Sequence, residues 1–239
     1  YKDKYKGYNG SGTEACCQIQ YEYDILNQKI ITLELDAARV SDLEYAYKSI
    51  KSITPNELIL RDCAYGSIEA LTEISEKGAF FISKIKDQIS IFEKVNNEYR
   101  LLSYKEIIRR IKKSGTNQKE FMVYIGRNKF SPMRLIARAL DNAEVQKRIR
   151  RKNRSRGKIS KESEAKCELN LIVTNIPAEK VAFSDIYPIY KIRWQIEIVF
   201  KTWKSILKIH HCKKMKVERF ECYLYSKLLW MLISRDMVG

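Results

Sequence analysis

The sequence predicts an α/β fold whose sheet and helices are interrupted by a β-rich insert. Three observations carry this prediction: strand-like and helical patterns alternate over residues 1–86, short strand-like pieces dominate residues 87–174, and a long helix returns within residues 175–239. We therefore expect a core in two segments, 1–86 and 175–239, with an insertion domain, 87–174, between them. With 239 residues the chain is long enough to bury such a core.

The first core segment opens with a hairpin signal. Residues 15–25, ACCQIQYEYDI, alternate in part between apolar and polar side chains, and a second strand-like run, QKIITLEL, follows after the short turn LNQ. Ser41 can cap a helix over residues 42–53, which the pair Thr54–Pro55 ends. We expect two paired strands followed by a helix.

A strand, a helix and a second strand come next. Leu58 to Leu60 form a short apolar strand that runs into Asp62, and the strand-like run AFFISKI follows an amphipathic helix between the cap residues Ser67 and Gly78. Ligands of open α/β sheets bind at the carboxyl ends of strands, so Asp62 is a candidate site residue. A loop-capping aspartate is the competing interpretation.

The expected insert, residues 87–174, differs from the first core segment in its pattern of strands and helices. Its strand-like pieces are ISIFEK, EYRLLS, EFMVYIG and MRLIARAL, and a helix is expected at Tyr104–Lys113. Residues 143–166 form a highly charged helix or coil. Within them, residues 147–158 hold eight Lys or Arg side chains and no acid.

Residues 187–209, YPIYKIRWQIEIVFKTWKSILKI, are expected to form one helix with two stripes. The apolar stripe repeats at spacings of three and four and consists of Ile189, Ile192, Ile196, Val199, Trp203 and Ile206. A polar stripe follows one residue later and consists of Tyr190, Arg193, Glu197 and Lys204. Glu197 is therefore expected at the edge of the buried face. Solvated ion pairs between successive turns are the competing interpretation.

Net charge and cysteine usage narrow the class of partner. The chain carries 45 Lys and Arg against 29 Asp and Glu, a net charge of +16, which favours a polyanion and above all nucleic acid. No apolar run approaches the ~20 residues of a membrane span, and no basic amphipathic anchor is evident, so no membrane partner is expected. The six cysteines form no C-x-x-C pair, which favours reduced thiols and a cytoplasmic protein over a zinc site.

Acids in so basic a chain need a chemical reason. A carboxylate repels phosphate, but it becomes useful when it holds Mg²⁺ between itself and a phosphate. Two such ions ~3.5–4 Å apart can activate an attacking oxygen and stabilise a leaving one. Asp62 and Glu197, with basic neighbours, form a combination that fits this chemistry.

The spacing Tyr190-x2-Arg193-x3-Glu197-x6-Lys204 resembles the Tyr-Arg-Glu-Lys signature of bacterial insertion-sequence transposases. These enzymes belong to the DDE superfamily and have an RNase H-like catalytic domain, a mixed sheet with flanking helices. The run LILRDCAYG is similar to the block around their second aspartate. The 134 residues between Asp62 and Glu197 would suit the β-rich insertion domain of this group, and the resemblance covers nearly the whole chain.

The resemblance implies a role for each matching residue. Asp62 and Glu197 would be the second and third metal-binding acids, at a two-metal site that takes Mg²⁺, with Mn²⁺ as a substitute. Tyr190, Arg193 and Lys204 would contact phosphates. Trp194 would stack on a displaced base, with core packing as an equal alternative. The implied reaction is hydrolytic nicking of transposon ends followed by attack of a 3′-hydroxyl on target DNA.

One departure from the family pattern concerns the first acid, which comes on a strand before CQIQYEYD and is followed by Ser or Thr. Asp3 lies in a Lys-rich lead, Asp24 ends what would be the second strand, and Asp36 and Asp42 come later. We therefore expect the first catalytic Asp upstream of Tyr1, and a chain truncated at its N-terminus that does not complete strand transfer alone.

The basic run has two interpretations, a solvated loop or a contact with the DNA backbone through Arg150, Arg151 and Arg154. The expected partner is double-stranded DNA, both transposon ends and target, in the bacterial cytoplasm. A dimer in the DNA complex is implied by the resemblance alone. A metal-dependent nuclease of the same fold and a non-catalytic DNA-binding remnant stay open as alternatives. An RNA-binding module is disfavoured because the Gly-aromatic strands typical of one are missing.

Overall fold

The computed structural model describes residues 4–7, 15–86, 89–126, 131–213 and 215–238. Two compact units divide the chain. Unit 1 combines Tyr1–Ser41 with Trp194–Gly239, and unit 2 is Asp42–Arg193. The predicted boundaries at residues 86 and 174 mark a segment inserted into a core. A division into compact units does not test whether a segment is inserted, so these boundaries stay a prediction. Among the described residues, no helix has both the length and the apolar character that crossing a membrane requires.

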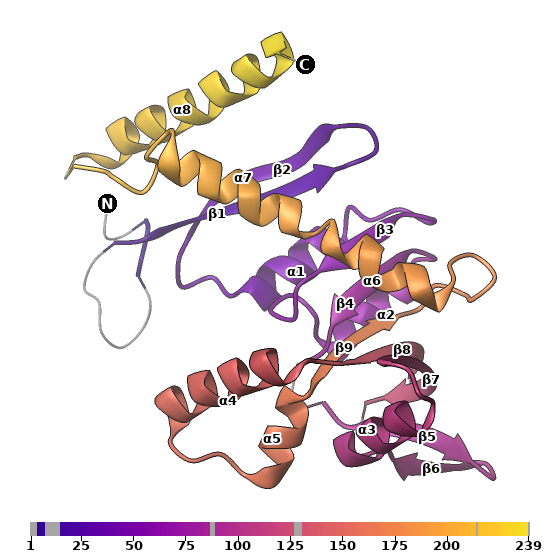
Figure 1. Cartoon of the computed structure of the whole chain (residues 1–239). Coiled ribbons are helices and arrows are strands. Elements are labelled where there is room, and N and C mark those ends of the chain that lie inside the picture. Colours follow the sequence, from indigo (N-terminus) through magenta and orange to yellow (C-terminus); the bar gives the residue numbers. More distant parts are fainter. Residues whose placement is uncertain (1–3, 8–14, 87–88, 127–130, 214, 239) are drawn as a thin grey trace. The chain divides into compact units, whose positions relative to one another are not determined.

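Unit 2 contains a sheet of seven strands in the order β3-β4-β9-β8-β7-β5-β6 (Figure 1). Its strands are β3 Leu58–Arg61, β4 Phe80–Lys84, β5 Ile91–Val95, β6 Glu98–Leu101, β7 Gln118–Ile125, β8 Ser131–Ala139 and β9 Leu169–Thr174. Only β3 and β4 are parallel neighbours, and all other adjacent pairs are antiparallel. The mixed α/β class is therefore confirmed, with a mostly antiparallel sheet. The strands of the expected insert share this sheet with β3 and β4, because β9 pairs with both β4 and β8.

Helices cover both faces of this sheet. Strands β4, β8 and β9 alternate their side chains between two apolar clusters, since successive residues of a strand point to opposite faces. One cluster joins the sheet to α2 (Ile68–Glu76) and α3 (Tyr104–Lys113). The other joins it to α6 (Phe183–Lys191), through Ile186 and Tyr190. Each strand contains a continuous apolar stretch, FFI in β4, LIA in β8 and LIV in β9, because both faces are buried there.

The remaining helices of unit 2 are α1 Asp42–Ile50, α4 Asn142–Arg156 and α5 Lys161–Cys167. Local signals predicted several helix ends correctly. Ser67 caps α2 by accepting a hydrogen bond from the Ala70 amide at 3.1 Å, and Gly78 follows the helix with φ of +72°. Helix α3 begins and ends at its predicted residues. The charged segment, for which the sequence predicts helix or coil, forms the helices α4 and α5.

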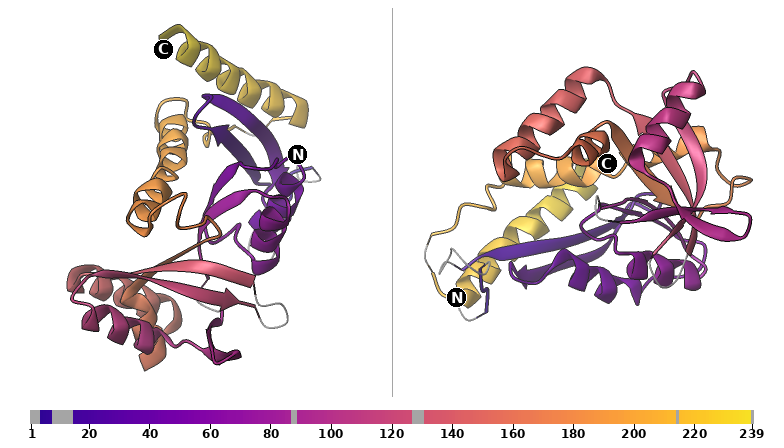
Figure 2. Two further views of the ribbon diagram at one scale, coloured as in Figure 1. Left: turned by 90° about the vertical axis from the view of Figure 1, so that its right-hand side faces the viewer. Right: turned by 90° about the horizontal axis from the view of Figure 1, so that it is seen from below.

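Unit 1 contains the predicted hairpin and two helices (Figures 1 and 2). Strands β1 Cys17–Asp24 and β2 Lys29–Ala37 pair only with each other among the described residues. Helices α7 Trp194–Ser205 and α8 Val217–Val238 pack with them around Trp203, Phe220, Leu224 and Leu228. Tyr21 of β1 contacts the Trp203 ring edge-on, at 5.2 Å between centroids. The hairpin is thus held by helices from the other end of the chain.

The prediction of one helix over residues 187–209 is wrong. Helix α6 ends at Lys191 and α7 begins at Trp194. Between them the Ile192 and Arg193 amides bond to carbonyls three residues earlier, at 3.0 and 3.2 Å, in a tight 3₁₀-type turn. Pro188 inside α6 also lacks the amide that a continuous helix would use. The apolar stripe is interrupted accordingly, since Ile192 and Ile206 are exposed.

Asn175 links the end of β9 to the turn between α2 and β4. Its side-chain oxygen accepts from the Phe81 amide at 2.9 Å, and its amide nitrogen donates to the Ala79 carbonyl and the Ser75 hydroxyl, both at 2.9 Å. Two of these bonds satisfy backbone groups, the Phe81 amide and the Ala79 carbonyl. Asn175 therefore fixes the chain just before α6.

Replacing Asn175 with alanine is expected to lower the free energy of unfolding by about 2–3 kcal/mol, since three hydrogen bonds of about 1 kcal/mol each are lost. Asn153→Ala is the matched control, because that exposed side chain accepts a single backbone bond, from Ile159. Urea denaturation followed by circular dichroism compares the two. Equal midpoints for both variants would contradict this role of Asn175.

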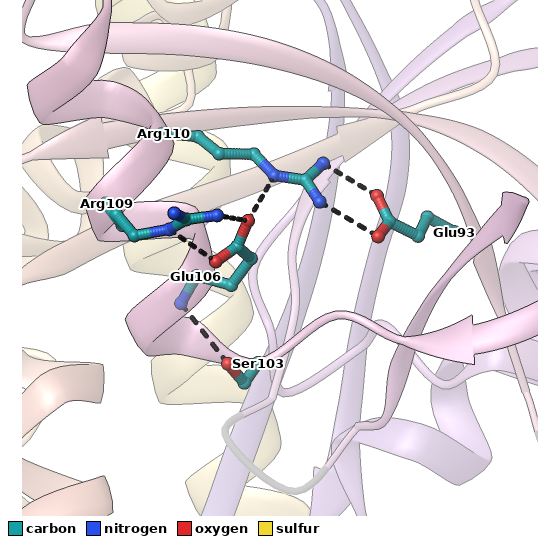
Figure 3. A network of polar contacts seen from close by, with 5 residues as sticks. All are labelled: Glu93, Ser103, Glu106, Arg109 and Arg110. Carbon is teal, nitrogen blue, oxygen red and sulfur yellow. Dashed lines mark hydrogen bonds and ion pairs between the residues drawn. The ribbon is translucent and has the colours of Figure 1, made fainter.

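A network of charged side chains ties α3 to β5 (Figure 3). Arg110 donates to both oxygens of Glu93, at 2.6 and 2.9 Å, and to Glu106 at 2.7 Å. Arg109 donates to both oxygens of Glu106 at 2.8 Å. The Glu106 amide donates to Ser103, which caps the helix. Hydrogen bonds from Arg109, then from Arg110, lower the pKa of Glu106 to about 2.

This lowered pKa predicts a pH-dependent contribution to stability. A carboxylate whose pKa falls on folding stabilises the fold fully above its unfolded pKa, about 4.3, and loses that contribution as pH falls toward the folded value. The urea midpoint of the wild type should therefore exceed that of Glu106→Gln at pH 6, and the difference should shrink between pH 5 and pH 3. A difference that stays constant over this range would refute the assignment.

Candidate active site at the carboxyl ends of β3 and β4

Asp62 lies immediately after β3, as the sequence predicts. Because β3 and β4 are parallel, their carboxyl ends meet at one edge of the sheet, where Lys84 ends β4. The Asp62 side chain is 41% exposed. Its Oδ1 accepts from the Cys63 amide at 2.7 Å, and its carbonyl accepts from the Tyr65 amide at 3.1 Å. The carboxylate is thus oriented by a tight turn and open to a ligand.

Two neighbours hold this turn in place. Arg61 is buried and donates to the Ala46 carbonyl at 3.3 Å and to the Ser49 hydroxyl at 2.6 Å, which fixes β3 to α1. At Gly66 an added Cβ would lie 2.7 Å from the Ser83 hydroxyl of β4. Only glycine permits this approach without displacement. The Asp62 turn is therefore held between α1 and β4.

Arg193 and Tyr190 join Asp62 within unit 2. The Arg193 guanidinium lies 3.9 Å from Asp62 Oδ2, and its side chain is 14% exposed. It also lies over the Tyr190 ring, 5.6 Å from the ring centroid, and the Lys84 ammonium lies 5.9 Å from the same centroid. The turn that breaks the helix delivers Arg193 to this position. One acid, two cations and a phenol therefore meet at this edge.

The pKa values at this edge argue against a protein nucleophile. Burial is the main cause that raises the pKa of Tyr190 to about 12, although the Arg193 charge opposes it. Burial first, and the Asp62 charge second, raise the pKa of the Cys63 thiol. Both groups stay neutral near pH 7, so neither supplies a thiolate or phenolate. The Tyr190 hydroxyl is itself buried, and the described residues give it no hydrogen-bond partner.

Three further predicted site residues, Trp194, Glu197 and Lys204, belong to unit 1, and Arg150, Arg151 and Arg154 lie on α4 in unit 2. Trp194 is the first residue of α7 and is 51% exposed. Glu197 is half-buried in the first turn of α7, where the helix dipole favours a carboxylate. Lys204 is exposed in the last turn. The structure thus brings together Asp62, Tyr190 and Arg193, and the contribution of α7 to the same site stays a prediction.

Asp62 is the acid at this edge that could bind a metal ion. Among the described residues, no three His, Cys, Asp or Glu side chains gather as a metal-binding group. Asp62 fits as one ligand, because its side chain is 41% exposed and a carboxylate oxygen is a ligand that Mg²⁺ prefers. Further ligands have to come from elsewhere, and Glu197 is the candidate named by the sequence.

Sequence reasoning missed Lys84 and the buried pair Gly66 and Ser83. Lys84 ends the strand-like run AFFISKI, so the rule that parallel strands end at one edge could have placed it beside Asp62. Gly66 gave no signal beyond its place in a turn, because its close contact with Ser83 depends on how β3 and β4 pair. All six cysteines are free thiols in this structure.

Comparisons with known proteins identify the family of this chain. A family model described as the transposase DDE domain matches residues 1–233. The transposase for insertion sequence element IS231F of Bacillus thuringiensis subsp. israelensis is 31% identical over 242 residues, which cover 94% of this chain and 50% of that protein. The transposase for IS1151 of Clostridium perfringens is 29% identical, over 100% of this chain and 54% of that protein.

The chain spans about half the length of these curated relatives. No solved structure matches it. The family model nevertheless extends over nearly every residue, including the Asp62 turn and both helices of the Tyr190 to Lys204 signature. The chain therefore belongs to the transposase DDE domain family.

Proposed function

We propose that this chain is the catalytic part of a DNA transposase, which nicks transposon ends by hydrolysis and joins the freed 3′-hydroxyl to target DNA. The observation that carries the proposal is the meeting of Asp62, Arg193 and Tyr190 at the carboxyl ends of β3 and β4, in a chain of net charge +16. A carboxylate is of use beside phosphate when a cation lies between them. Family membership supports the reaction class.

The proposed metal ligands are Asp62 and Glu197, and the proposed ion is Mg²⁺, in a two-metal site where Mn²⁺ substitutes. When bound, the metal supplies Lewis-acid activation of the attacking oxygen and stabilisation of the leaving one. The 2.7 Å bond from the Cys63 amide orients the Asp62 carboxylate for this role.

An RNase H-like core with a β-rich insertion is the fold we infer for the family domain.

The cations of the site have a separate task. Arg193 and Lys84 flank the Asp62 edge and offset the charge of a scissile phosphate. Tyr190 donates its neutral hydroxyl, and Lys204 contacts the backbone further along the DNA. Trp194, exposed at the start of α7, stacks on a base displaced near the transposon end. The substrate is double-stranded DNA, held in a complex of two subunits.

A metal-dependent nuclease on the same fold is the second candidate, because it would use the same acids and the same charge. Only the products separate the two: joined strands mark a transposase and cut strands alone mark a nuclease. A non-catalytic remnant would bind DNA and do neither.

The test uses the full product of the gene that encodes this chain, together with the inverted repeats that flank that gene. Sequencing these flanks defines both reagents, and an in-frame Asp followed by Ser or Thr would supply the remaining acid. Incubation with a labelled repeat, a target plasmid and Mg²⁺ is expected to give nicked ends and joined products. Joining with EDTA present, or no reaction with Mg²⁺ or Mn²⁺, would refute the proposal.

A further inference from the structure

Helix α4 has two faces of different chemistry. Its inner face packs on unit 2 through Val145, which is 7% exposed. Arg148 also belongs to this face, because it donates to the Leu169 carbonyl at 3.0 Å and pairs with Glu144 at 3.3 Å. Ile149 and Lys152 are half-buried beside it. Part of the basic run is therefore structural.

The outer face is basic and open. An open hollow of about 980 Å³ follows it. Its lining includes Gln146, Lys147, Arg150, Arg151, Arg154 and Ser155. None of the described residues that line this hollow is acidic. We call Lys147, Arg150, Arg151 and Arg154 the basic face of α4.

The spacing of these four cations suits a polymer of phosphates. They recur three or four residues apart, so they share one side of the helix. Lys147 and Arg154 are separated by about 10 Å along the axis, at 1.5 Å per residue. One strand of duplex DNA advances 3.4 Å per phosphate, so about three phosphates span that length. A helix dipole favours Arg154 near the C-terminus, but it does not explain Lys147 and Arg150 in the middle.

The sheet places α4 at the same edge as Asp62. Strand β8 is antiparallel to β9, and β9 is antiparallel to β4, so β8 runs in the direction of β3 and β4. The register aligns Ile136 of β8 with Ile172 of β9, and Ile172 with Lys84 of β4. The carboxyl end of β8 therefore points to the edge that carries Asp62, and α4 begins there after its cap residue Asp141.

We propose that the basic face of α4 binds the phosphate backbone of duplex DNA, independently of sequence, and extends the path of DNA held at the Asp62 edge. This inference rests on the proposed function, since it assumes that the Asp62 edge acts on DNA. It adds Lys147 to the predicted contacts Arg150, Arg151 and Arg154. The task of this face is affinity and alignment, not chemistry.

The experiment measures binding of a fluorescein-labelled 30-base-pair duplex by anisotropy, at KCl concentrations from 50 to 300 mM. Each lost phosphate contact reduces the slope of log K against log [KCl] by about 0.9. The triple variant R150A/R151A/R154A is expected to flatten the slope by about 2–3. The triple variant R150K/R151K/R154K keeps the charges and should keep the slope. Alanine is a strong helix former, so α4 itself is retained.

A matched control removes three charges from another exposed helical surface of unit 2. K105A/K112A/K113A, on α3, should leave the slope unchanged. An equal change in this control, or an unchanged slope in the α4 alanine variant, would overturn the inference while leaving the proposed function intact. Tighter binding of a 30-nucleotide single strand would overturn the choice of duplex. A wild-type chain that binds neither DNA would overturn the inference and the DNA partner together.

Discussion

Replacing Asp62 with asparagine is expected to lower the rate of strand cleavage and joining by at least about 10³-fold, while binding of duplex DNA persists. Asparagine keeps the size of the side chain and an oxygen for the Cys63 amide, but it removes the negative charge that a divalent cation needs. Metal-based stabilisation of a phosphoryl-transfer transition state supplies several kcal/mol, and each 1.36 kcal/mol is tenfold in rate. Glu197→Gln should cause a loss of the same order.

The control for this prediction is Asp24→Asn. Asp24 ends β1, and its carboxylate accepts backbone bonds from Leu26 and Asn27, both at 3.0 Å, so it is also an acid at the end of a strand. It serves a hairpin turn only, and its loss should leave the reaction rate unchanged. Rates are compared in the full gene product on its own repeats. Mn²⁺ binding, followed by electron paramagnetic resonance, should weaken in Asp62→Asn and stay unchanged in Asp24→Asn. A wild-type reaction rate in Asp62→Asn would show that Asp62 is not part of the active site.

The position of Asp62 could be predicted because its signal is local. A short apolar strand followed by an acid and a glycine-containing turn requires no knowledge of distant contacts, and the same is true of the Ser67 cap of α2 and the bounds of α3. The partners of Asp62 are different. Lys84 reaches this edge only because β3 and β4 are parallel neighbours, a pairing that the strand–helix–strand order permits but that long-range contacts decide.

The break between α6 and α7 could not be predicted from a local signal. The stripe through Ile189, Val199 and Trp203 fits one continuous helix, and periodicity alone cannot detect that its two halves belong to different cores. Ile189 packs with the α6 cluster of unit 2, whereas Val199 and Trp203 pack with the hairpin of unit 1. A 3₁₀-type turn at Ile192 and Arg193 changes the helical phase between them. Tertiary packing therefore decides where the helix predicted over residues 187–209 breaks into α6 and α7.

The second large effect is expected from Trp203→Ala, which should lower the free energy of unfolding of unit 1 by about 3–5 kcal/mol. Trp203 is 1% exposed and meets Tyr21 and Phe200 edge-on, at 5.2 and 5.3 Å between ring centroids. Its removal leaves a cavity between α7 and β1 that the remaining side chains fill only in part. Hydrogen exchange of peptides from α7 and β1 should accelerate, while peptides from β9 in unit 2 keep their protection.

Trp194→Ala is the matched control, since this tryptophan lies on the same helix but is 51% exposed, and its loss should cost less than about 1 kcal/mol. The two variants separate packing from DNA contact. Trp203→Ala should impair cleavage by loosening α7, and Trp203→Phe should restore much of the protection and the rate. Trp194→Ala should impair cleavage with exchange unchanged. If Trp203→Ala left exchange in α7 unaltered, the buried tryptophan would not be the anchor that holds Glu197 on a fixed helix, and another contact of α7 would have to carry that role.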